Sequence, residues 1–218
     1  MSASCPTGSD GFVDAWSGIG KVDSSVGRPA KFNTEQILDA TAQLVAEGGP
    51  ALATVAGIAE RLGAPTGSIY HRFNSRDLLL ARLWIRTVRR SQEGFVAALA
   101  QDDVETAAIE AALYVPRWSR SNVDDACVLL LYRREQLAEQ WPDELGDELA
   151  TLNDAIKAGV RGFVRRRFGS VTKANLDVAS FALLDVPYAA VRRYLMRGVP
   201  PPPSVDDLVA RTVRCILG

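Results

Sequence analysis

The amino-acid sequence predicts an all-α protein built from two helical domains. Beyond residue 29, apolar residues recur at intervals of three and four positions along almost the whole chain, which is the period of amphipathic helices. No segment alternates apolar and polar residues around Asn-Gly turns, so strands and hairpins are not expected. Charge is also divided unevenly along the chain, and this division indicates two parts with different tasks.

The uneven charge separates a basic segment from an acidic remainder. Residues 28–92 contain nine Arg and Lys against five Asp and Glu, whereas residues 93–218 contain fifteen basic and eighteen acidic side chains. The formal net charge of the whole chain, −1, hides this difference. A basic segment beside an acidic one is typical of a nucleic-acid-binding module joined to a regulatory or oligomerising module.

The cysteines and the apolar runs argue against several other classes of protein. Cys5, Cys127 and Cys215 are odd in number and far apart, which argues against a disulfide framework and against a zinc site. We therefore expect no metal or other cofactor, and a reducing, cytoplasmic location. No secretory signal and no uninterrupted apolar window of roughly 18 residues is present, so no membrane association is expected.

Residues that start or end helices divide the first part of the chain. Residues 1–29, rich in Gly and Ser, are predicted to be a disordered tail, and residues 30–76 a three-helix domain. Asn33 or Thr34 can cap a first helix that Gly48-Gly49-Pro50 ends. Thr54 can cap a second, short helix closed by Gly63, and a third must fit between Pro65 and Phe73.

Longer helices follow. Ser75 caps a helix over residues 75–100 that links the first domain to a regulatory and dimerisation domain, residues 77–218. Within the latter we predict helices at Val104–Ser119, Asp124–Gln140, Pro142–Phe168, Thr172–Met196 and Ser204–Leu217. The Pro142–Phe168 segment carries an apolar stripe from Leu145 to Val164 that needs a partner surface.

The stretch GAPTGSIYHRF, residues 63–73, has the character of a recognition helix. At about 100° per residue, Ile69 and Phe73 share one face, and the polar residues lie on the other face and its borders. Hydroxyl, backbone and cationic groups of this kind bind phosphates and base edges. We therefore predict a helix-turn-helix whose second helix enters the major groove of DNA. The outward residues are Thr66, Gly67, Ser68, Tyr70, His71 and Arg72.

Here the sequence resembles a known family. ILDATAQLVAEGG, followed by TVAGIAERLGAPTGSIYHRFNSRDLLL, is similar to the N-terminal DNA-binding domain of the tetracycline-repressor-like (TetR) family. The resemblance covers Ile37 to Leu83, about a quarter of the chain. It implies a homodimer that binds double-stranded operator DNA, formed through the last two long helices. It also implies a C-terminal all-α domain with a cavity for a small-molecule inducer.

The resemblance also assigns roles to single positions. Thr66, Gly67, Ser68 and Tyr70 match residues that approach bases or the sugar-phosphate edge, and Thr54 matches a threonine that meets phosphate. The Arg72 position often holds a phosphate-binding His, and the Arg76 position usually holds a phosphate-binding Lys. Ala56 and Gly57 depart from the family, because many members carry charged or polar side chains there.

Several basic residues allow two interpretations. Arg28 and Lys31 could enter a minor groove as an N-terminal arm, or form a basic linker. The arginines at 82, 86, 89 and 90 could form a solvated helix face or touch DNA, and Arg165 to Arg167 could complement a helix end or bind nucleic acid. An enzyme is not expected, because the single His71 has no second histidine, paired carboxylates or cysteine nearby.

The candidate ligand site lies in the C-terminal part. Aromatic residues recur on its predicted helices, and Asp185 and Pro187 interrupt an otherwise apolar run. Such residues can form a solid core, or line a pocket for a largely apolar inducer. The predicted pocket residues are Trp118, Tyr132, Phe181, Asp185 and Tyr188. The predicted function is a ligand-responsive repressor with a palindromic operator; the alternative is a constitutive dimeric regulator without an inducer pocket.

Overall fold

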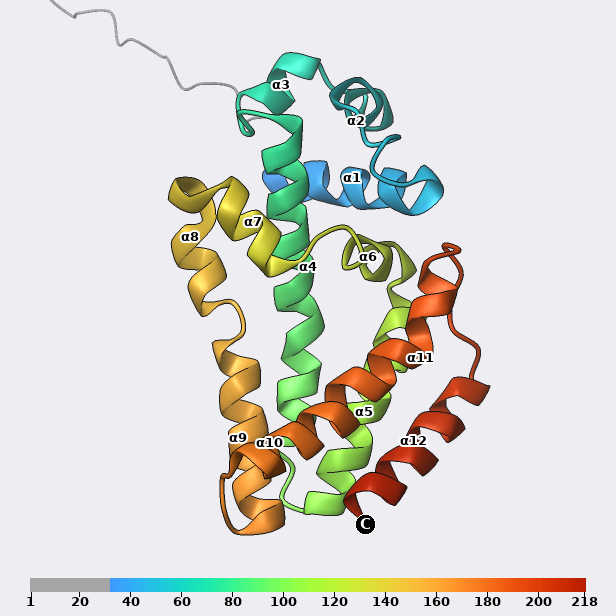
Figure 1. Ribbon diagram of the computed structural model, residues 1–218. Helices are drawn as coiled ribbons and strands as arrows, with labels where there is room; N and C mark the ends of the chain where they lie inside the picture. The colour runs from blue at the N-terminus through green and yellow to red at the C-terminus, as the bar shows by residue number, and fades with distance from the viewer. Residues whose placement is uncertain (1–31) are drawn as a thin grey trace, which may run out of the picture. The chain divides into compact units, whose positions relative to one another are not determined.

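The computed structural model describes residues 32–218, and within this range the chain is helical with no strand (Figure 1). The predicted tail 1–29, with the candidate DNA contacts Arg28 and Lys31, lies outside the described residues. The α-helices are α1 (Thr34–Gly48), α2 (Val55–Leu62), α3 (Thr66–Tyr70), α4 (Arg76–Leu99), α5 (Val104–Ser121), α6 (Val123–Val128), α7 (Arg134–Gln140), α8 (Pro142–Thr151), α9 (Asp154–Phe168), α10 (Lys173–Ser180), α11 (Val186–Leu195) and α12 (Ser204–Leu217). The all-α prediction is confirmed.

Local capping sets the boundaries of the first helices. Asn33 caps α1, with its side chain accepting the Gln36 N–H at 2.8 Å, and the Gln36 side chain accepts the Asn33 N–H at 2.9 Å. Thr54 caps α2 by accepting the Gly57 N–H at 3.0 Å, and Ser75 caps α4. Each cap satisfies backbone donors that the helix itself leaves free. These starts agree with the sequence prediction.

Helix α4 belongs to both hydrophobic cores. Its first half, with Leu79, Leu83 and Trp84, packs with α1–α3, and its second half, with Phe95 and Leu99, packs with α5 and α9–α12. Figure 1 shows α4 running from the helix-turn-helix down between α8–α9 on one side and α5–α6 on the other. A movement of this helix therefore reaches both cores.

The apolar stripe predicted for residues 142–168 finds its partner surface on both cores. Leu145, Leu149 and Leu152 join the core that contains α1–α3, whereas Val160 and Phe163 join the other core. The stripe is carried by two helices rather than one, because the helix is interrupted at Leu152 and Asn153. Asn competes with helical hydrogen bonding through its side chain, and here that side chain accepts a bond from Gln92 of α4.

Two other predicted helices depart from regular α-helix: the single-helix prediction was wrong for residues 124–140, whereas residues 173–195 form one continuous helix with a π-helical turn. The predicted 124–140 helix is split into α6 and α7, and the carbonyl of Leu129 in the gap accepts the Trp84 indole N–H at 3.4 Å. The predicted 172–196 helix contains a π-helical turn, Phe181–Asp185, in which the Val186 N–H bonds to the Phe181 carbonyl. This turn ends two residues before Pro187, which lacks the N–H needed to continue an α-helical ladder.

Gly94 allows α4 and α5 to approach closely. A Cβ at this position would lie 2.1 Å from Cε2 of Tyr114 on α5, well inside van der Waals contact. Tyr114 is half-buried, and its ring covers the glycine. Only a residue without a side chain fits under the ring unless Tyr114 moves.

We expect Gly94→Ala to lower the free energy of unfolding by about 1–3 kcal/mol, because overpacking displaces Tyr114. Chemical denaturation monitored by circular dichroism measures the change. The matched control is Gly162→Ala on α9, where an added Cβ meets nothing within 4 Å. The control should be stabilised slightly, by up to about 1 kcal/mol, because alanine is the better helix former. Equal stability of the two variants would contradict the close-approach argument.

Candidate DNA interface and ligand cavity

Helices α2 and α3 form the helix-turn-helix. Gly63 ends α2 in the left-handed conformation, with φ 59°, and its amide and that of Ala64 return to carbonyls of the last turn of α2. Ile69 and Phe73 are buried, at 1% and 6% exposure, and pack in the same core as Ile58. The side of α3 that the sequence assigns to the core therefore faces the core.

The opposite side of α3 faces solvent. Thr66, Gly67, Tyr70 and His71 are exposed, and Tyr70 keeps 56% of its surface accessible. Ser68 and Arg72 are partly covered, because the Arg72 guanidinium donates to the Ser68 carbonyl at 3.0 Å. The helix itself ends at Tyr70, and hydrogen-bonded turns carry the chain on to Phe73. The structure thus places hydroxyl, phenol, imidazole and guanidinium groups together on the outer side of α3 and the turn that follows it.

Within residues 32–218, no contact explains why residue 67 is a glycine. It lies in α3 with an ordinary helical backbone, and an added Cβ would meet nothing within 4 Å. Glycine normally costs helix stability, so its presence needs a reason outside the protein's own packing. Close approach of another molecule to the α3 backbone is such a reason.

Arg76 and Thr54 lie where the start of α4 meets the loop between α1 and α2. The Arg76 side chain donates from Nε to the Ala53 carbonyl at 2.9 Å and from Nη2 to the Pro50 carbonyl. These bonds tie the start of α4 to the α1–α2 loop that carries the cap residue Thr54. Arg76 thus has an internal positioning role, which the sequence did not indicate, and its side chain remains one-third exposed.

The arginines of α4 form internal ion pairs. Arg86, only 11% exposed at its side chain, bonds Glu35 at 2.9 Å and Asp39 at 2.8 Å on α1. Arg90 joins the same acidic residues and Asp125 of α6, and Arg82 and Arg89 pair with Glu148 of α8. The solvated-face interpretation is therefore wrong for Arg86, because its guanidinium is largely buried among carboxylates.

A cavity of about 460 Å³ lies between α4, α5, α9 and α11. Trp118, Asp185 and Tyr188 line it, whereas Tyr132 packs against the core that contains α1–α3, and Phe181 is exposed on the surface. The full lining comprises Ser91, Gln92, Phe95, Tyr114, Val115, Trp118, Ser119, Leu129, Asn153, Ile156, Lys157, Leu184, Asp185, Tyr188, Val191 and Leu195. Its volume falls in the range of small-molecule sites, roughly 300–1,000 Å³.

Comparison with known proteins gives the family. The sequence profile described as "Bacterial regulatory proteins, tetR family" matches residues 37–83, which include all of α2 and α3 and part of α4. Residues 37–83 form a DNA-binding domain of the TetR family. The chain is a helix-turn-helix, DNA-binding transcriptional regulator, as the sequence resemblance indicated.

Related sequences and solved structures match most of this chain. Uncharacterized HTH-type transcriptional regulators of Mycobacterium bovis and Mycobacterium tuberculosis are 25% identical over 178 residues, which are 79% of this chain and 86% of each relative. FadR, the fatty acid degradation regulator of Bacillus halodurans, has a TM-score of 0.62 and 18% identity, over 85% of this chain and 98% of its own. PfmR from Thermus thermophilus has a TM-score of 0.59 and 20% identity, over 83% and 96%. These structures establish the likeness of fold.

The sequence did not single out the polar residues of the cavity. Gln92 and Asn153 meet there, with Gln92 Nε2 donating to Asn153 Oδ1 at 3.0 Å, and Ser119 is 3% exposed. Burial raises the pKa of the neighbouring Tyr114 phenol, which therefore stays protonated. An available signal was the polar pair Ser91-Gln92 within the otherwise apolar inner side of α4.

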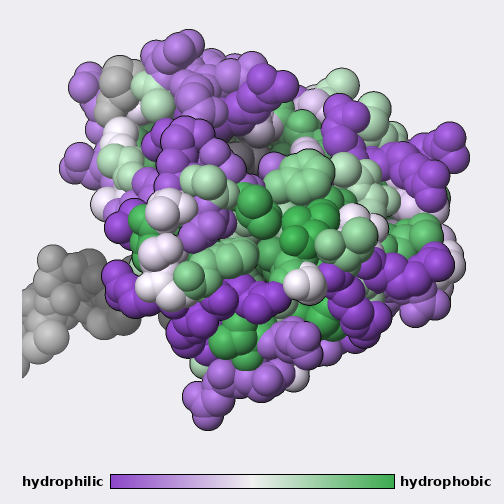
Figure 2. Space-filling model, turned by 60° about the horizontal axis from the view of Figure 1, so that its bottom comes forward, coloured by the Kyte–Doolittle hydropathy of each residue, from purple (hydrophilic) through white to green (hydrophobic). Residues whose placement is uncertain are grey.

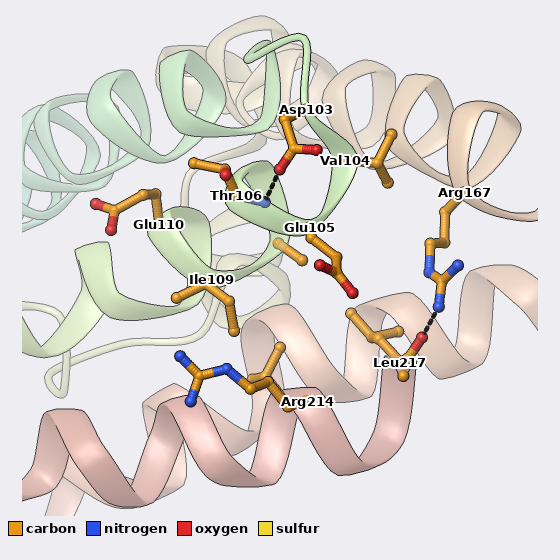
Figure 3. A pocket seen from close by; sticks show the side chains of 12 residues that line it. Asp103, Val104, Glu105, Thr106, Ile109, Glu110, Arg167, Arg214 and Leu217 are labelled. Carbon is orange, nitrogen blue, oxygen red and sulfur yellow. Dashed lines mark hydrogen bonds between the residues drawn. The ribbon is translucent and has the colours of Figure 1, made fainter.

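A second hollow, of about 420 Å³, lies where α5 begins and α9 and α12 end (Figure 3). Its polar groups already serve the helix ends. Asp103 accepts the Thr106 N–H at 2.7 Å, which caps α5, and Arg167 donates to the Leu217 carbonyl at the end of α12. Arg167, the one arginine of the 165–167 run in this lining, thus bonds the last carbonyl of α12, which leaves the first cavity as the better ligand site.

We expect Gly67→Ala to weaken DNA binding by about 10-fold or more without destabilising the regulator, because a methyl group would block close approach to the α3 backbone while meeting no protein atom. Fluorescence anisotropy with bound genomic fragments and thermal unfolding give the two readouts. Gly162→Ala, far along the chain on α9, is the control for both measurements. Unchanged DNA affinity in Gly67→Ala would show that α3 does not approach DNA through this residue.

Proposed function

We propose that this protein is a ligand-responsive transcriptional repressor that binds a palindromic operator as a homodimer and is released by a small-molecule inducer. The observation that carries the proposal is the cavity beside α4, the helix that also packs into the core of the DNA-binding domain. The alternative, a constitutive dimeric regulator, has no use for such a cavity. As a chromosome-binding regulator it would act in the cytoplasm.

The proposed DNA contacts follow from the outward face of the helix-turn-helix. Ser68, Thr66 and Tyr70 would read base edges and sugar from α3, and His71 and Arg72 would lie toward the phosphates. Thr54 uses its hydroxyl oxygen as a cap acceptor, which leaves its hydroxyl hydrogen available for a phosphate. Arg76 would present its remaining exposed edge to the same strand.

The proposed dimer surface lies on α10–α12. Val178, Phe181, Tyr188 and Leu208 are exposed there, at 39%, 53%, 45% and 49%. Figure 2 shows hydrophobic residues gathered in the middle of one face of the molecule. Exposed apolar patches of this kind on a soluble domain indicate an interface, because water contact with them is unfavourable. A second copy would cover this surface and bring two recognition helices to the two half-sites.

The same helices explain one feature of the composition. The Lys173–Leu195 run is long and apolar enough to cross a membrane by length and composition, and only 28% of its most apolar window is buried. This property alone is weak evidence for a membrane span, because helices of soluble proteins also have it. Burial against a second copy would account for the apolar residues that the monomer leaves exposed.

The cavity can communicate with the DNA-binding domain through α4 and α6. Ser91, Gln92 and Phe95 line the cavity from α4, and two turns earlier Arg86 of the same helix bonds α1. Leu129 follows α6 directly and lines the cavity, and Asp125 of α6 faces Arg86 and Arg90. A ligand that shifts either helix would alter the spacing of the recognition helices in the dimer.

The test combines operator selection with ligand titration. Genomic fragments retained by the purified protein define the operator, and a metabolite screen by thermal shift yields ligands. A true inducer should lower operator affinity by about 5- to 150-fold, and operator should weaken the inducer by the same factor, because coupling is reciprocal. Ligands that stabilise the protein and leave operator affinity unchanged would favour the constitutive alternative.

We expect Phe181→Asp to convert the dimer into a monomer and to weaken operator binding, because a charge would be placed in an apolar interface. Light scattering with and without operator measures the change. Asp177→Asn on α10, which lies in the same region and pairs with exposed Lys173, is the control. A Phe181→Asp variant that stays dimeric would locate the interface elsewhere.

A further inference from the structure

The wall of the cavity carries polar groups but no buried charge. Ser119 lines the cavity and is 97% buried, and its hydroxyl has no hydrogen-bond partner within the part of the chain that the structure describes. On another wall, the Gln92 amide bonds Asn153 with one N–H. This bond leaves the Gln92 carbonyl oxygen and the Asn153 amide group available to a ligand.

The charged groups of the lining lie at its edge. Lys157 and Asp185 are exposed, and Lys157 already pairs with Asp154 at 3.2 Å. The remaining lining is aliphatic, aromatic or neutral and polar. A carboxylate or ammonium group moved inside would lose its hydration and find no opposite charge, whereas a neutral oxygen would find hydrogen-bond donors.

We infer that the ligand is an uncharged, largely apolar molecule carrying a carbonyl or hydroxyl oxygen, bound by the neutral polar groups of Ser119, Gln92 and Asn153. This inference rests on the proposed function and specifies the ligand class of the same cavity. The Ser119 hydroxyl bonds no other group of residues 32–218, so its removal costs the empty protein little, and we assign its contribution to the bound state rather than to folding.

FadR from Bacillus subtilis offers a contrast. That protein, with a TM-score of 0.62 and 15% identity over 85% of this chain and 98% of its own, is solved in complex with stearoyl-CoA. At this identity only the fold is shared. The neutral inner wall of the present cavity argues for a ligand that carries no phosphate or carboxylate into it.

The experiment compares head groups on one chain length. Binding of 2-decanone, 1-decanol, decanoate and decylammonium to the full chain is measured by isothermal titration calorimetry at pH 7. We expect the ketone or alcohol to bind at least about 10-fold more tightly than both ions, because burying an unpaired ion costs more than burying a hydrogen-bonded oxygen.

Three variants and one control variant locate the binding. Ser119→Ala should weaken the neutral probes by about 2- to 10-fold, the loss of one hydrogen bond. Asn153→Asp has the same shape, keeps the acceptor for Gln92 and adds a negative charge, so decylammonium should become the preferred probe. Gly94→Ala should weaken all probes, because it pushes Tyr114 toward the cavity, and Gly162→Ala should change none.

Tighter binding of decanoate or decylammonium to the wild type, absence of binding by every probe, or an Asn153→Asp variant with unchanged preference would each overturn the inference. Operator titrations on the same samples keep the two proposals apart. If an ion binds and releases operator, the neutral-ligand inference fails and the ligand-responsive function stands. If the neutral probes bind as expected but operator affinity never responds, the inference about the cavity stands and the inducer mechanism fails.

Discussion

The burial of the Arg86 guanidinium is the constraint on which the arrangement of the helices depends. A charge that is removed from water needs opposite charges close by, and here they come from α1 and α6, with Arg86 itself on α4. Its Nε and Nη2 atoms are buried without a hydrogen bond within residues 32–218, and Nη2 lies 3.9 Å from Asp125. The bond to α1 is therefore close, and the one to α6 is long.

This asymmetry matters for how the two parts of the molecule are joined. Short, well-aligned charge pairs hold two elements firmly, whereas a pair at the limit of contact changes its energy with small displacements. The Arg86 pairs therefore hold α1 to α4 more closely than they hold α6, whose Ala126 and Val128 are fixed by burial in the cores.

Two glycines of this structure are needed for different reasons, one for packing within the protein and one, as we propose, for contact with another molecule. Gly94 is required by the protein, since a phenol ring occupies the space of its missing side chain. Gly67 is not required by any internal contact, although it lies in a five-residue helix that would gain from alanine. The two glycines therefore have different roles. Gly94 makes room for Tyr114, and Gly67, as we propose, makes room for DNA.

The sequence by itself determined the features that depend on near neighbours in the chain. Asn33, Thr54, Gly63 and Ser75 act on amides or turns within a few residues, so their capping roles were predictable, as was the inward side of α3. The resemblance added the family. Only the tertiary structure decided where the long helices break, which arginines are buried and which polar groups line the cavity. Those outcomes depend on contacts between distant positions, such as Gln92 with Asn153 and Arg86 with Glu35, and helical periodicity carries no information about them.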